Sequence, residues 1–75
     1  MIFVPAIYDA LKEEYKTTHL MYRAFIESKQ LGVVPNVTLE NERIHKRGIF
    51  SDYYTIVDPR RWLLTKIRYG IDEQR

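Results

Sequence analysis

Seven cationic side chains are the groups in this sequence best suited to bind a ligand. Arg and Lys donate charge-assisted hydrogen bonds to phosphate oxygens, so a cluster of them is a candidate site for a nucleic-acid backbone. The candidates are Arg23, Lys29, Arg43, Lys46, Arg47, Arg60 and Arg61.

Arg60 and Arg61 are the most informative pair, because they follow Asp58-Pro59 at the start of an expected helix. The helix dipole disfavours cations at that end. A phosphate bound there would be favoured by both the dipole and the guanidinium groups. The alternative interpretation is that both arginines are solvated or pair with Asp58 or other acids.

Charge is unevenly distributed along the chain. Residues 1–42 carry four Lys/Arg against six Asp/Glu, a net charge of −2. Residues 43–75 carry eight against four, a net charge of +4. A basic half indicates an anionic partner, although a solvated surface of the same composition has no partner at all.

Composition argues against several other classes of protein. The chain has 75 residues, enough for one small domain, and no Cys, which excludes a disulfide framework and a thiolate metal site. His19 and His45 lie outside any metal-ligand spacing, and the three glycines form no phosphate loop. We therefore expect no enzyme activity, cofactor or metal. No apolar run approaches a membrane span, so we expect a cytoplasmic protein.

The first long segment, residues 5–31, is predicted to be helical. Pro5 suits the first turn of a helix, and Gly32 suits its end. Apolar spacing favours one unbroken helix over the whole segment. The threonines at 17 and 18 favour a break instead, which would leave helices at 5–15 and 18–31. The sequence leaves both open.

The middle of the chain is predicted to form strands. Residues 37–39 indicate a short extended piece, and 43–50 with 53–57 indicate a hairpin that turns at Ser51-Asp52. Gly48 indicates a bulge, or an earlier turn.

Asp58-Pro59 then predicts a helix over 59–69 that ends at Gly70. Its inward face is expected to carry Trp62 or Leu63, the stem of Lys66, and Ile67. The fold class is therefore α+β: a single domain with an N-terminal helix or helix-turn-helix, a wing-like β-hairpin and a C-terminal helix.

Two stretches resemble small winged-helix proteins of the excisionase/AlpA and MerR-like kind. The second helix of that family and the chain after it are similar to TTHLMYRAFIESKQLGVVP, and the wing return and last helix are similar to SDYYTIVDPRRWLLTKI. The resemblance covers about residues 6–68. It implies a recognition helix at 17–28, with Arg23 toward DNA, and a wing at 43–53 that carries Lys46 and Arg47.

Two functions follow from these observations. The first is a small DNA-binding accessory protein or transcriptional regulator, of the kind found in phages and mobile elements. The second is an α-ββ-α protein-interaction module, such as a phage-type structural joiner or a small inhibitor of a larger enzyme. Self-association would then use a stripe of Tyr8, Tyr15 and Tyr22 on one long helix. An unbroken helix over 6–30 would favour the second function, because it would remove the helix-turn-helix.

Overall fold

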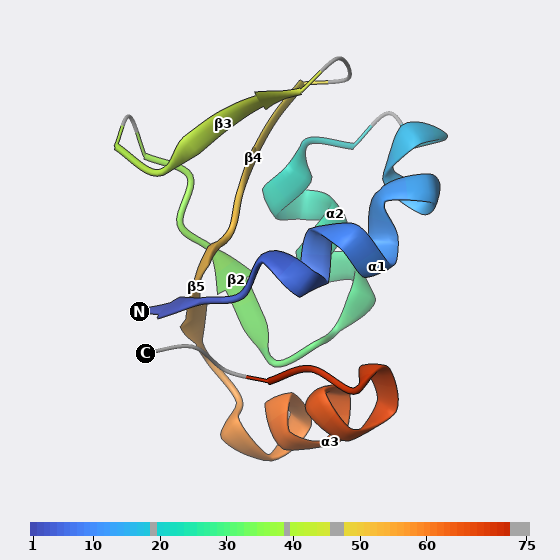
Figure 1. Ribbon diagram of the computed structural model, residues 1–75, viewed down its shortest axis with the longest axis vertical. Helices are drawn as coiled ribbons and strands as arrows, with labels where there is room; N and C mark the ends of the chain where they lie inside the picture. The colour runs from blue at the N-terminus through green and yellow to red at the C-terminus, as the bar shows by residue number, and fades with distance from the viewer. Residues whose placement is uncertain (19, 39, 46–47, 73–75) are drawn as a thin grey trace.

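The chain folds as one α+β domain, and its described residues form three helices and five short strands (Figure 1). A computed structural model describes residues 1–18, 20–38, 40–45 and 48–72. In chain order the elements are β1 (Ile2–Phe3), α1 (Pro5–Lys16), α2 (Tyr22–Lys29), β2 (Val33–Pro35), β3 (Glu42–His45), β4 (Gly48–Ser51), β5 (Tyr53–Ile56) and α3 (Pro59–Tyr69).

Of the two alternatives for residues 5–31, the structure shows the break near the threonines, since α1 ends at Lys16 and α2 begins at Tyr22. Both threonine hydroxyls bind nearby backbone. The Thr17 hydroxyl donates to the Glu14 carbonyl at 3.0 Å, and the Thr18 hydroxyl accepts from the Leu20 N–H at 3.3 Å. Such local bonds compete with the helical ladder. The second helix is shorter than the expected 18–31.

Gly32 does not end α2 as expected, because Gln30 takes the left-handed conformation there, with φ of 55°. Gly32 instead allows α3 to approach. Its φ is 85°, and a Cβ at this position would lie 2.4 Å from the Trp62 backbone nitrogen. Its carbonyl accepts from the N–H groups of Val57 and Asp58 at 2.9 and 3.1 Å. The glycine thus fixes the start of α3.

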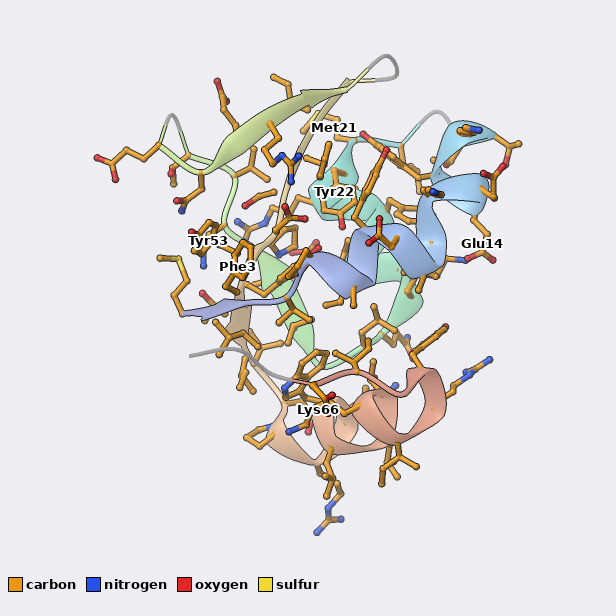
Figure 2. All side chains as sticks on the ribbon, in the orientation of Figure 1. Phe3, Glu14, Met21, Tyr22, Tyr53 and Lys66 are labelled. Atoms are coloured by element: carbon orange, nitrogen blue, oxygen red, sulfur yellow. The ribbon has the colours of Figure 1, made fainter. Side chains whose placement is uncertain are left out.

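Strand β5 is the centre of a three-stranded antiparallel sheet with the order β1-β5-β2. Tyr54 lies opposite Ile2 on one side and Pro35 on the other. The rings of Phe3 and Tyr53, 5.0 Å apart, also join β1 to β5 (Figure 2). The short extended piece expected at 37–39 is not a strand over residues 37 and 38, and residue 39 lies outside the described residues. Val33 and Val34 pair with β5 instead.

The predicted hairpin of 43–50 with 53–57 is wrong in its pairing. Strand β3 pairs with β4, with Glu42 opposite Ser51 and His45 opposite Gly48, so the chain turns before Gly48. The chain does not reverse at Ser51-Asp52, where the Asp52 carbonyl accepts from the Val4 N–H at 2.7 Å. We call the β3–β4 pair the ribbon; Figure 1 shows it extending beyond the sheet.

Aromatic rings fill the core between the helices, the sheet and the ribbon. Tyr8 of α1 stacks on Phe50 of β4 with 3.9 Å between ring centroids. Tyr22 lies at the centre of this group (Figure 2), edge-on to Tyr15 and to Phe50. Large buried rings compensate for the small size of the domain.

The capped final helix is confirmed at its predicted bounds. The Asp58 carboxylate accepts from the Arg61 N–H at 3.1 Å, and Gly70 ends the helix at φ of 64°. Trp62 is buried as expected, and its neighbour on the inner face is Thr65, whose hydroxyl donates to the Leu31 carbonyl at 2.9 Å. Ile67 was expected to face inward and is exposed, as is Leu63, the alternative to Trp62, because Trp62 and Thr65 occupy the contact.

Candidate nucleic-acid interface

The outer surface of α2 carries the first predicted contact residue. Arg23 is exposed and pairs with Glu27, one helical turn later, at 3.2 Å. Ala24, Glu27 and Ser28 share the exposed side of this helix, while Tyr22, Phe25 and Ile26 are buried. A small and mostly neutral surface such as this can enter a groove, but Arg23 is its only exposed cation.

The ribbon lies beside α2 and supplies the second predicted group (Figure 1). The Arg43 guanidinium lies 2.6 Å from the carboxylate of Asp52 and 5.3 Å from the centroid of Phe50. The Asp52 side chain is only 3% exposed and that of Arg43 is 63% exposed, so the pair lies at the surface with its acid buried. Arg43 therefore neutralises a buried carboxylate. Lys46 and Arg47 lie outside the described residues.

A groove at the other end of α2 collects the remaining candidates. It has a volume of about 410 Å³ and runs between the end of α2 and one side of α3. Lys29, Arg60 and Arg61 all line it, together with Arg68. Sequence reasoning missed Arg68, although its position seven residues after Arg61 places the two on one side of a helix.

The groove cations differ in how far they are neutralised. Lys29 pairs with Glu14 at 3.1 Å. Arg61 donates to Gln30 at 2.9 Å and lies 3.9 Å from the Asp58 carboxylate. Arg60 is exposed and makes no ion pair within the described part of the chain. The alternative in which Asp58 neutralises the arginines therefore applies to Arg61 alone.

The basic residues that the sequence groups together form two separate clusters. Figure 1 shows the ribbon and α3 at opposite ends of the longest axis of the domain, which extends over 31 Å. Arg43 lies at the ribbon end, whereas Lys29, Arg60 and Arg61 lie at the α3 end. A ligand that contacts both clusters would have to span most of the molecule.

The tyrosine surface of the alternative interpretation does not form. In that interpretation Tyr8, Tyr15 and Tyr22 form a stripe on one long helix, whereas the structure places them on two helices with all three buried in the core. The break between α1 and α2 turns their rings toward one another, and the rings of Tyr15 and Tyr22 lie 5.1 Å apart. Their contacts are therefore with their own domain.

Two further features bear on the site. Within residues 1–18, 20–38, 40–45 and 48–72, no group of three or more His, Asp or Glu side chains could hold a metal ion. None of the helices in that same part of the chain has the length and apolar character needed to cross a membrane.

Comparison with known proteins gives no relative from which a function could be transferred: no family model, curated protein or solved structure matches the chain. The resemblance to winged-helix proteins therefore remains an expectation from the sequence.

Proposed function

We propose that this protein binds duplex DNA as a small winged-helix-type accessory protein or regulator, in the cytoplasm. The observation that carries the proposal is the interruption of the helix between Lys16 and Tyr22, with α2 lying beside the β3–β4 ribbon. In a helix-turn-helix the second helix enters the major groove. A wing beside that helix would contact the adjoining backbone.

The proposal gives the groove contact to α2 and the backbone contacts to the ribbon. Arg23 is the residue on α2 that can reach base edges, because an arginine can bind guanine through two hydrogen bonds. To contact DNA, Arg23 would give up its ion pair with Glu27. This costs little free energy because the pair is exposed. The ribbon would contribute Lys46 and Arg47, as the sequence predicts.

The charges on α2 and the ribbon indicate that the affinity for DNA comes mainly from contacts with the phosphate backbone. Arg23 and Glu27 cancel on α2, and Asp52 offsets Arg43 on the ribbon. Two or three phosphate contacts would give a slope of about −2 to −3 for log K against log salt. The protein would therefore bind many sequences, with modest preference among them.

The test is fluorescence anisotropy of a labelled random-sequence duplex, titrated with the protein at about 50 mM and about 200 mM salt. We expect binding at the lower salt concentration that weakens at the higher one with the slope given above. We also expect Arg23→Ala to weaken binding at least about fivefold, which is the low end for loss of a base contact. Absence of binding below the ~10⁻⁴ M limit of non-specific association would rule the proposal out.

Arg60→Ala is the comparison variant, because it also removes one exposed arginine but at the α3 end. The assignment to α2 and the ribbon requires Arg23→Ala to have the larger effect. If Arg60→Ala weakened binding and Arg23→Ala did not, DNA would be bound in the α3 groove and the helix-turn-helix assignment would be wrong.

A further inference from the structure

Helix α3 presents an apolar strip to solvent. The exposed fractions of Leu63, Leu64 and Ile67 are 53%, 62% and 71%. With 3.6 residues per turn these three positions fall on one face, opposite the buried Trp62 and Thr65, and the exposed Arg60 lies at the N-terminal end of the same face. The packing of α3 against the domain therefore makes little use of them.

Positive charge borders this strip along one side. Residues 59–69 contain four Lys/Arg and no carboxylate. Arg61 and Arg68 line the groove next to Leu64, and Lys29 lines it from the end of α2. Arg60 lines it as well, so the 410 Å³ groove combines an apolar edge with four cationic side chains.

We propose that the outer face of α3 is the docking site for an acidic amphipathic helix of a partner protein. Apolar side chains of that helix would cover Leu63, Leu64 and Ile67. Carboxylates on its flank would lie over the groove and pair with Arg61, Arg68 and Lys29. Helix recognition of this kind uses apolar anchors at i, i+3, i+4 and i+7, with charge complementarity fixing the orientation.

The arrangement fits this partner better than three other occupants. A nucleic-acid backbone would use the arginines but has no use for three exposed aliphatic side chains. A second copy joined through α3 would bring its cations against the same cations. A flat lipid surface would cover the apolar strip but would not fill the groove between α2 and α3.

The site is independent of the proposed DNA contact, because the ribbon and α3 occupy opposite ends of the domain (Figure 1). The same chain could therefore hold DNA at one end and a protein at the other. Failure of one proposal leaves the other standing.

The probe is a fluorescent synthetic helix with Leu at i, i+3, i+4 and i+7 and Glu at the flanking positions. Two control peptides replace every Glu by Lys, or every Leu by Ser. We expect the Leu/Glu peptide to bind, measured by anisotropy, and both control peptides to bind at least about tenfold more weakly. Added salt should weaken the interaction, since the flank is ionic.

Variants of the protein test the position of the site. Leu64→Ser and Ile67→Ser should each weaken binding of the Leu/Glu peptide at least about fivefold, in line with the loss of an interface anchor. Val57→Thr is the matched control: Val57 is 61% exposed, close to the value for Leu64, but lies outside α3 and outside this groove. We expect it to change binding less than about twofold. Because all three side chains are exposed, the variants should fold, which circular dichroism checks.

Other results would overturn the proposal. The proposal is overturned if the Leu/Glu peptide shows no binding at millimolar concentration, or if the Lys peptide binds as well. It is also overturned if sedimentation shows a dimer that Leu64→Ser dissociates, since the occupant is then a second copy. Binding to vesicles of anionic lipid that Leu64→Ser abolishes would assign the face to a membrane instead.

Discussion

The hydroxyl groups of Tyr22 and Tyr54 lie 2.5 Å apart in the core and form a hydrogen bond between α2 and β5. Both residues are almost fully buried. The bond joins the second helix of the proposed helix-turn-helix to the central strand of the sheet. This hydrogen bond is a polar contact inside an aromatic core that holds α2 against the sheet.

Alkaline pH should destabilise the domain through this pair. Burial raises the pKa of Tyr22 far above its ordinary value of 10.0, and the adjacent Tyr54 raises it further; burial also raises the pKa of Tyr54. Above pH 10 the unfolded chain loses phenolic protons that the folded chain keeps, so stability is complete below pH 10 and falls as pH rises. The expected slope is about 1.4 kcal/mol per pH unit for each tyrosine. Urea denaturation at a series of pH values between about 9 and 11 measures it.

Removing one hydroxyl of the Tyr22–Tyr54 pair should lower the free energy of unfolding more than removing both. Tyr22→Phe or Tyr54→Phe leaves a buried hydroxyl without its partner, which costs about 1–3 kcal/mol. The double variant leaves no such group, so we expect its loss of stability to be smaller than that of either single variant, and therefore well below their sum. Chemical denaturation of all four proteins gives the coupling energy. Strict additivity would mean that the hydrogen bond contributes nothing.

Gly32 should be far more sensitive to substitution than Gly70. Both have positive φ, so alanine costs about 1–2 kcal/mol at either position. At Gly32 the new Cβ also meets backbone atoms of Trp62 and Asp58 at 2.4 and 2.6 Å, whereas nothing lies within 4 Å at Gly70. Overpacking adds about 1–3 kcal/mol, so we expect Gly32→Ala to cost about 3 kcal/mol. Equal midpoints in urea for the two variants would contradict this account.

Arg43 should matter for stability in a way that Arg23 does not. Arg43→Ala leaves the buried Asp52 carboxylate without its ion-pair partner, and loss of a hydrogen bond to a charged group costs about 1.5–3 kcal/mol. Arg23→Ala removes a pair that is exposed on both sides, worth under about 0.5 kcal/mol. Thermal unfolding should show a lower midpoint temperature for Arg43→Ala than for Arg23→Ala. A DNA-binding defect in Arg43→Ala must therefore be corrected for its unfolded fraction.

Local signals fixed the features that depend on neighbouring residues in the chain. Asp58, Pro59 and Gly70 define the last helix, because capping and helix termination involve bonds across only three or four residues. The threonines at 17 and 18 indicated the break between α1 and α2 for the same reason, although the spacing of apolar residues alone favoured one helix. The candidate cations could be named from the sequence, but not which of them lie together.

Long-range contacts decided the rest. Strand β5 could have paired with the preceding strand, and it pairs with β1 and β2 because Ile2 and Val33 bury their side chains on either side of it. The inner face of α3 is Trp62 with Thr65, because the approach at Gly32 sets the rotation of that helix and leaves Leu63 and Ile67 in solvent. The sequence by itself determined the bounds of α3 and offered the break after α1, since those signals are local. Only the tertiary structure decided which faces are buried, because burial depends on residues brought together from distant parts of the chain.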